Sequence, residues 1–351
     1  MARTLVVAPS WIGDAVLSHP LLVRLKARDA AGTIDVLAPP WALPVYRRMP
    51  EVSAAIANPF GHGDLRLGER RRFARSLDPY DQAIVLPNSF KSALIPWHAG
   101  IARRTGYRGE MRFGLLNDVR RLDPEALPLI AERYAALAQP AGEAFARPMA
   151  PPRLRVEAAS RDAALRNHGL ALDRPVLALA PGAEYGPAKR WPPRHFAALA
   201  ATFIGRGHQV WLFGSAKDAE VTAQIAALAG PACRDLAGRT SLDEAIELMS
   251  AADRVVTNDS GLMHVAAALD RPLAAVFGSS SPAFTPPLSA RARVISLRLA
   301  CSPCFARTCP LGHTHCLETL APAEVLAALE MGPAPVSPYN GGGNSAAAPE
   351  S

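Results

Sequence analysis

Short β-branched runs along this chain alternate with longer segments in which hydrophobic positions recur at helical spacing. Each run is followed by a few polar or glycine residues and then by a helical pattern, an order typical of parallel sheets covered on both faces. The runs that predict buried strands are residues 5–8, 34–37, 83–86, 176–180, 209–213, 254–257 and 273–277. Helices are expected between them, among them residues 15–28, 195–204 and 262–269. The pattern therefore predicts a doubly wound α/β protein.

The strand–helix alternation occurs once in each half of the chain. A length of 351 residues is enough for two domains of ordinary size. Residues 139–155, rich in Pro and Ala, read as the connection between them. We therefore expect an N-terminal Rossmann-like domain over residues 1–155 and a second one over 156–332. Residues 333–351, a mix of Gly, Ala, Pro and Ser, predict a disordered tail.

A strand, a tight turn and an apolar helix follow one another between Val255 and Leu269. A helix that starts directly after a strand presents free N–H groups at the positive end of its dipole, which suits a phosphate. Ser260, Gly261 and His264 are the candidate anion-binding residues. The same pattern also fits an ordinary helix start with Ser260 as the N-cap.

A second loop, Pro181–Trp191, follows another predicted strand and contains Lys189. A lysine there could pair with a phosphate, or it could be an ordinary surface lysine. Ligands of doubly wound domains bind beyond the carboxyl ends of the strands. The loops after Ala8, Ala180 and Thr257 all follow strand ends, so we expect them to line one cleft between the two domains.

Charged residues are unevenly distributed along this chain, which has a net charge of +7. Its composition, 49% hydrophobic and 20% charged, is typical of a soluble globular protein. Residues 61–121 alone hold twelve basic and six acidic side chains. Such a basic face suits nucleic acid, anionic lipid or a phosphorylated substrate, and it is also compatible with solvated surface arginines. Nucleic-acid binding is the alternative from a different functional class, but the segment lacks interleaved aromatics and known nucleic-acid motifs.

Several familiar motifs and segments are absent from the sequence. It has no G-x-G-x-x-G after the first strand, no G-x-x-x-x-G-K-[ST], no H-E-x-x-H and no G-x-S-x-G, which weighs against dehydrogenases, P-loop kinases, zinc proteases and α/β-hydrolases. No apolar run reaches the roughly 18 residues of a membrane span, and Asp14 interrupts the first one. A cytoplasmic location is expected.

Several stretches, in one order, resemble the ADP-heptose:lipopolysaccharide heptosyltransferases. They are Pro9–Asp14, Pro87–Ser92, Arg104–Glu110, Pro181–Trp191 and Asn258–His264. The resemblance runs from about residue 3 to residue 318 and is strongest to the heptosyltransferase II branch. It implies the GT-B fold, with an ADP-heptose donor on the C-terminal domain and a heptosyl-Kdo2-lipid A acceptor on the N-terminal domain. The implied reaction is inverting transfer of the second heptose of the lipopolysaccharide inner core.

The resemblance also implies roles for individual residues. Asp14 would be the catalytic base, although it could instead cap the first helix. Asp259 would contact the heptose hydroxyls, a role compatible with capping its own turn. Lys189 and the helix start at Ser260 and Gly261, with His264, would stabilise the departing diphosphate. Heptosyltransferase I, or a transferase for another nucleotide-sugar, is the alternative within this class.

Acceptor binding is assigned to the basic segment because arginine forks match both carboxylates and phosphates. The same charges would hold the enzyme at the cytoplasmic surface of the inner membrane as a peripheral protein. No nucleic-acid partner and no tightly bound cofactor are expected. The candidate acceptor-binding cations are Arg70, Arg71, Arg72, Lys91, Arg104, Arg108 and Arg112.

Four of the five cysteines cluster near the C-terminus, at Cys301, Cys304, Cys309 and Cys316. Their thiolates could close a structural zinc site, although the spacing fits no common zinc module. Redox-sensitive thiols and inert thiols are the other two interpretations. Disulfides are disfavoured in the cytoplasm. The remaining Cys233 is expected in the core.

Overall fold

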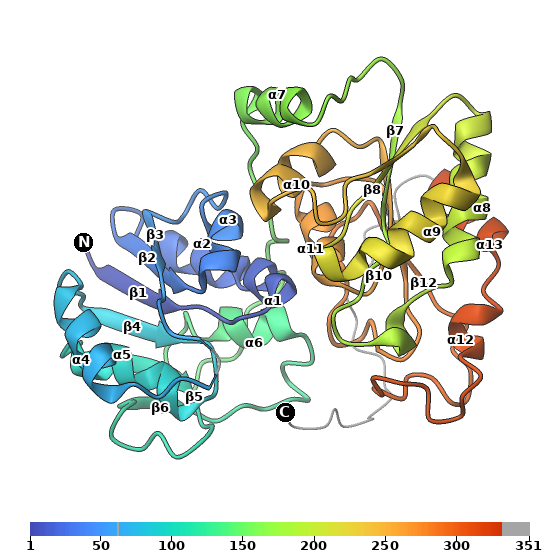
Figure 1. Ribbon diagram of the computed structural model, residues 1–351. Helices are drawn as coiled ribbons and strands as arrows, with labels where there is room; N and C mark the ends of the chain where they lie inside the picture. The colour runs from blue at the N-terminus through green and yellow to red at the C-terminus, as the bar shows by residue number, and fades with distance from the viewer. Residues whose placement is uncertain (62, 332–351) are drawn as a thin grey trace. The chain divides into compact units, whose positions relative to one another are not determined.

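Two six-stranded sheets, each in a unit of its own, make up this computed structural model, which describes residues 1–61 and 63–331 (Figure 1). One unit comprises Met1–Arg155 and the other starts at Val156. All strand pairs within both sheets are parallel. The predicted fold class, two doubly wound Rossmann-like domains, is confirmed. The predicted disordered tail, residues 333–351, lies outside the described residues.

The N-terminal sheet has the strand order β3-β2-β1-β4-β5-β6. The chain winds outward from β1 in one direction and then returns to β4 to wind in the other. The two strands at this switch point therefore leave a crevice beyond their carboxyl ends. The strands are β1 (Arg3–Val7), β2 (Thr33–Ala38), β3 (Ala54–Ala57), β4 (Gln82–Val85), β5 (Arg103–Tyr107) and β6 (Asp118–Arg120).

The helices of this unit are short. The predicted single helix over residues 15–28 is two helices, α1 and α2, which meet at Ser18. Pro20 lacks an N–H group and so is accommodated only in the first turn of a new helix. The helices are α1 (Ile12–Leu17), α2 (His19–Arg28), α3 (Leu43–Tyr46), α4 (Leu67–Ser76), α5 (Leu94–His98) and α6 (Ile130–Ala136), with 3₁₀ helices η1 (Pro40–Ala42) and η2 (Phe90–Ala93).

The C-terminal sheet has the order β12-β11-β10-β7-β8-β9, which is the same winding starting from β7. Its switch point lies between β7 and β10. The strands are β7 (Val176–Ala180), β8 (Gln209–Leu212), β9 (Cys233–Asp235), β10 (Arg254–Asn258), β11 (Leu273–Val276) and β12 (Ala292–Ile295). The helices are α7 (Ala158–Asn167), α8 (Pro193–Gly205), α9 (Ala219–Ala229), α10 (Leu242–Met249), α11 (Gly261–Ala268), α12 (His315–Glu318) and α13 (Pro322–Glu330), with η3 (Pro187–Lys189) and η4 (Ala216–Asp218).

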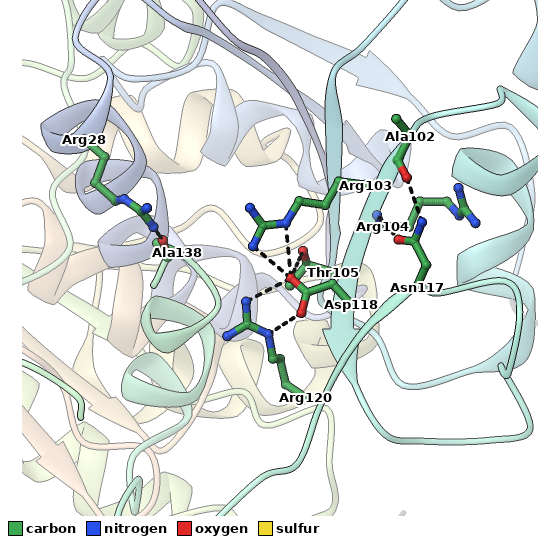
Figure 2. A network of polar contacts seen from close by, with 9 residues as sticks. All are labelled: Arg28, Ala102, Arg103, Arg104, Thr105, Asn117, Asp118, Arg120 and Ala138. Carbon is green, nitrogen blue, oxygen red and sulfur yellow. Dashed lines mark hydrogen bonds and ion pairs between the residues drawn. The ribbon is translucent and has the colours of Figure 1, made fainter. Parts of the chain in front are cut away.

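Strands β5 and β6, which the hydrophobic pattern does not predict, are joined by side-chain polar contacts as well as by their backbones. The Asp118 carboxylate accepts hydrogen bonds from Arg103 and Arg120 at 2.9 and 2.6 Å, and from Thr105 at 2.9 Å (Figure 2). The hydrogen bond from Arg120 is the largest cause that holds the pKa of Asp118 far below its ordinary value. An ion-pair network of this kind has no period-2 hydrophobic signature, so sequence patterning misses it.

Apolar packing of the central strands stabilises both units. In the C-terminal unit Trp191, Phe196 and Phe203 are buried in one cluster with β7, β8 and β10. The indole Nε1 of Trp191 donates to the carbonyl of Leu320 at 3.0 Å, so this large side chain is also satisfied. Within residues 1–61 and 63–331, no helix combines the length and apolar character needed to span a bilayer.

Candidate active site

The loops that follow β7 and β10 begin side by side, because Ala180 and Thr257 are paired across the parallel ladder. The side chain of Asn258, which is fully buried, connects them. Its Nδ2 donates to the carbonyl of Pro181 at 2.6 Å, and its Oδ1 accepts from the backbone N–H of Trp191 at 3.0 Å. The two motifs singled out in the C-terminal half therefore form one site at the switch point of their sheet.

A buried ion pair lies at the centre of this site. Lys189 Nζ is 2.6 Å from Asp259 Oδ2, and the Asp259 side chain is only 6% exposed. The hydroxyl of Ser280 donates to the same carboxylate oxygen. Three loops, after β7, β10 and β11, thus each contribute one side chain. Ser280 was not among the predicted site residues, although its place in the loop that follows the run 273–277 was a signal that could have identified it.

His264 lies in α11, close to this pair, and is buried. Burial is the main cause that lowers its pKa to about 4, so the imidazole is neutral at pH 7. Its Nδ1 is buried and has no hydrogen-bond partner among the described residues. His264 therefore offers a neutral hydrogen-bonding group to a ligand and not a positive charge.

The start of α11 differs from the predicted cap in one respect. Ser260 is the N-cap residue, but its side chain makes no capping hydrogen bond. Its hydroxyl lies 3.3 Å from Thr257 Oγ1 instead. The first-turn N–H groups of α11 have no side-chain cap, which leaves the helix start suited to an anion.

The loop Pro181–Trp191 is held by hydrogen bonds to residues 305–307. The hydroxyl of Tyr185 donates to the carbonyl of Phe305 at 2.7 Å, and the N–H of Ala188 donates to the carbonyl of Arg307 at 3.0 Å. A Cβ on Gly186 would lie 2.5 Å from that second carbonyl, and the φ of Gly186 is +155°. Both the approach and the backbone angle require glycine here.

In the N-terminal unit, Asp14 lies just beyond the carboxyl end of β1. It occupies the first turn of α1, whose N-cap is Trp11 with no side-chain capping bond. No described residue forms a hydrogen bond or ion pair with the partly buried Asp14 carboxylate, and burial raises its pKa to about 6. The structure does not support the capping alternative. The Asp14 carboxylate instead lies without a partner among the described residues, in surroundings that raise its affinity for a proton.

Arg70, Arg104 and Arg112, predicted to bind the acceptor, have guanidinium groups that donate to backbone carbonyls, which gives them a structural role and makes them less available to an acceptor. Arg70 and Arg112 are also buried, at 4% and 3% exposure. They stabilise turns because each guanidinium donates hydrogen bonds to two backbone carbonyls. Their carbonyl acceptors are Asp64 and Leu65 for Arg70, Ile101 and Leu115 for Arg104, and Pro87 and Tyr107 for Arg112.

The other predicted acceptor cations lie at the surface. Arg71 and Arg72 are exposed on α4. Lys91, partly buried in η2, and the exposed Arg108 lie on the loops after β4 and β5, at the same end of the sheet as Asp14. Lys91 and Arg108 are therefore the better placed for an acceptor.

The predicted zinc site is not formed. All five cysteines are free, and Cys233 is in the core. Among residues 1–61 and 63–331, no group of three or more His, Cys, Asp or Glu side chains is arranged to hold a metal ion. Burial, followed by the nearby thiols of Cys301, Cys304 and Cys309, raises the pKa of Cys316. The structure places the four thiols near one another without converging them on one point.

A cavity of about 200 Å³ lies at the opposite end of the N-terminal sheet from Asp14. It is lined by residues at the amino ends of the strands, including Thr4, Ile34 and Arg103. Arg28, also on its wall, donates to the carbonyl of Ala138 (Figure 2). None of the predicted site residues lines this cavity.

Comparison with known proteins identifies the family of this site. The family model described as glycosyltransferase family 9 (heptosyltransferase) matches residues 70–315. Lipopolysaccharide heptosyltransferase 2 of Escherichia coli K12 is 53% identical over 306 residues, which cover 84% of this chain and 88% of that protein. The chain belongs to glycosyltransferase family 9.

Solved structures agree with this membership of family 9. The structure of E. coli ADP-heptose lipopolysaccharide heptosyltransferase II superposes with a TM-score of 0.84 at 48% identity, covering 93% of this chain and 98% of that one. A structure of the E. coli heptosyltransferase WaaC with ADP has the same fold, with a TM-score of 0.69 at 21% identity and coverage of 93% and 99%. The glycosyltransferase described here thus has the GT-B fold that its sequence predicted.

Proposed function

We propose that this glycosyltransferase transfers heptose from ADP-heptose to heptosyl-Kdo2-lipid A, with inversion at the anomeric carbon. The observation that carries the proposal is the Lys189–Asp259–Ser280 cluster beside the start of α11. This cluster occupies the switch point of a doubly wound sheet, where nucleotides bind. The chain is also 53% identical to a lipopolysaccharide heptosyltransferase 2.

In the proposed reaction Asp14 is the general base. It accepts the proton of the acceptor hydroxyl while that oxygen forms a bond to the anomeric carbon of the donor. The bond from this carbon to ADP breaks on the opposite face, and ADP leaves with the electron pair. A pKa of about 6 leaves Asp14 mostly ionised at pH 7 yet more basic than an ordinary carboxylate.

The leaving diphosphate gains negative charge, and the C-terminal site supplies compensating groups. Lys189 provides an ammonium, α11 provides uncapped N–H groups, and His264 provides a neutral donor. Asp259, held by Ser280, would orient the heptose through its hydroxyls. Lys189 Nζ lies 2.6 Å from Asp259 Oδ2. The same ammonium group can therefore contact both the carboxylate that would bind the sugar and the diphosphate.

Acceptor recognition is assigned to the N-terminal unit, with Lys91 and Arg108 as the cations for Kdo carboxylates and phosphates. The acceptor is anchored in a membrane by its lipid part. We therefore place the enzyme peripherally at the cytoplasmic face of the inner membrane, where its net charge of +7 attracts it to anionic lipid.

The test is to incubate purified enzyme and ADP-heptose with two acceptors, Kdo2-lipid A and heptosyl-Kdo2-lipid A, and to measure ADP release and product mass. We expect transfer to heptosyl-Kdo2-lipid A only. Transfer to Kdo2-lipid A alone would instead support the heptosyltransferase I alternative. Absence of transfer to either, together with strongly salt-dependent binding of arbitrary DNA, would contradict the enzyme assignment and favour the nucleic-acid alternative.

A further inference from the structure

Two half-exposed tryptophans flank the loop that carries Asp14. Trp11 is the N-cap residue of α1 and is 57% exposed. Trp41 lies in η1, after β2, and is 52% exposed. Strand β2 pairs with β1, with Val7 opposite Leu37, so both indoles belong to loops at the carboxyl end of the sheet.

The Trp41 indole is oriented by a hydrogen bond. Its Nε1 donates to the carbonyl of Ser10 at 2.8 Å, which ties the β2 loop to the loop that contains Asp14. An indole held in one orientation loses little further freedom when a ligand binds, so its contact area is converted into affinity efficiently. The bond also fixes the position of Trp41 relative to the catalytic base.

The exposure of Trp11 and Trp41 contrasts with the burial of two other tryptophans in this chain. Trp191 and Trp211 are completely buried, as expected for large apolar side chains. Trp11 and Trp41 instead leave about half of each side chain exposed, on two loops that the Trp41–Ser10 hydrogen bond joins, so both rings are available to a ligand at this end of the sheet. The occupant must carry an apolar face and lie next to Asp14.

We infer that Trp11 and Trp41 form a stacking platform for the sugar ring of the acceptor that presents its hydroxyl to Asp14. The inference rests on the proposed function. One face of a pyranose ring carries axial C–H bonds with partial positive charge, and these pack favourably on the electron-rich face of an indole. Stacking would fix the ring plane, while the hydroxyls at the ring edge remain free to reach the base.

The structure contains a matched control. Trp97, on α5, is 44% exposed, and its ring contacts the imidazole of His98 with centroids 4.7 Å apart. It therefore has similar exposure, but it lies near the end of α5 that leads into the amino end of β5, whereas Asp14 lies beyond the carboxyl end of β1. Loss of the Trp97 ring should not affect an acceptor bound at the carboxyl end of the sheet.

The experiment compares W11A, W41A, W11F, W41F and W97A by steady-state kinetics, with the saccharide of heptosyl-Kdo2-lipid A, freed of its acyl chains, as acceptor. We expect W11A and W41A each to raise the acceptor KM about five- to twentyfold with the donor KM unchanged. W11F and W41F should recover most of this loss because they restore an aromatic face. W97A should match the parent enzyme.

Equilibrium binding of the same saccharide, followed by tryptophan fluorescence in the W97F background, gives a readout independent of turnover. If the parent protein binds the saccharide without transferring heptose, and W11A weakens that binding, the proposed reaction is wrong but the platform stands. An unchanged acceptor KM and unchanged saccharide affinity in W11A and W41A would overturn the platform. Equal losses in donor and acceptor KM would also overturn it, since they would indicate a structural role.

Discussion

Asp14 and Asp259 both lie beyond the carboxyl end of a strand at the switch point of their sheet, Asp14 after β1 and Asp259 after β10, yet their surroundings are opposite. Each follows a central strand of a six-stranded parallel sheet at its switch point. Asp14 has no hydrogen-bond or ion-pair partner among the described residues, whereas Asp259 is bound by Lys189 and Ser280. The same fold thus presents one isolated carboxylate and one paired carboxylate.

The difference gives the two aspartates the distinct properties that the proposed reaction requires. Burial without a partner disfavours the charged form of Asp14 and raises its pKa to about 6, which makes it a better proton acceptor than an ordinary aspartate. The Lys189 ammonium and the Ser280 hydroxyl both contact Asp259 Oδ2 and hold this carboxylate in one orientation. The first arrangement suits a base, and the second suits a positioned anion that contacts sugar hydroxyls.

The largest expected effect comes from removing the isolated carboxylate. We predict that Asp14→Asn lowers kcat by about 10²- to 10⁴-fold while the donor affinity stays the same, because only proton transfer is lost. Folding should be unaffected, since no partner of Asp14 is left unsatisfied. Steady-state rates of the purified variant measure kcat, and a thermal melt measures the stability of the fold. Near-normal turnover would refute the assignment of Asp14 as the base.

Removing the cation of the paired site should have the next largest effect. Lys189→Ala is expected to lower kcat/KM for ADP-heptose by about 10- to 100-fold, since one charge-assisted contact to the diphosphate is lost. Arg206→Ala is the matched control because Arg206 forms an exposed ion pair with Glu330 at 2.5 Å, outside the loops of the site. Unchanged donor kinetics in Lys189→Ala would count against a donor-binding role for Lys189.

The hydroxyl of Ser280 should contribute less. Ser280→Ala removes one hydrogen bond to a carboxylate, for which a loss of about tenfold in kcat/KM for the donor is expected. Ser280→Thr should restore activity because it retains the hydroxyl. Ser279→Ala is the control, as the buried Ser279 hydroxyl has no partner among the described residues. An equal loss in both alanine variants would mean that the loop, and not the hydroxyl, is responsible.

The smallest effect concerns pH near neutrality. Asp14 accepts a proton only when ionised, so kcat/KM should rise with pH and reach half of its plateau near pH 6. Below that value it should fall tenfold per pH unit. His264, with a pKa of about 4, stays neutral over this range and should not contribute. A half-maximum near pH 4, typical of an ordinary carboxylate, would contradict the isolated state of Asp14.

The central strands could be predicted from the sequence, but the edge strands could not. Runs such as 176–180 are apolar throughout because both faces of a central parallel strand are covered. In the edge strand β6, Asp118 accepts hydrogen bonds from Arg103 and Thr105 of the neighbouring strand β5 and from Arg120 of its own strand. Pairing of this type depends on which strands meet, and no local pattern records it.

The candidate site was predicted unevenly. The motifs that hold Lys189 and Asp259 are local, so their residues could be named, and the structure joins them at 2.6 Å. Ser280 was missed because only the order of strands brings the end of β11 next to the end of β10. Arg112 was predicted to bind the acceptor on the basis of its charge alone, whereas in the structure its guanidinium donates to backbone carbonyls.

The sequence by itself determined the two doubly wound units, because strand and helix periodicity arise from local covalent geometry and from burial of contiguous residues. It also singled out the two loops whose residues Lys189 and Asp259 the structure brings together. Only the tertiary structure decided which charges are paired, since the partners of Asp259 come from other strands while Asp14 meets none. Pairing depends on distances between segments remote in sequence, and those distances exist only once the sheet has formed.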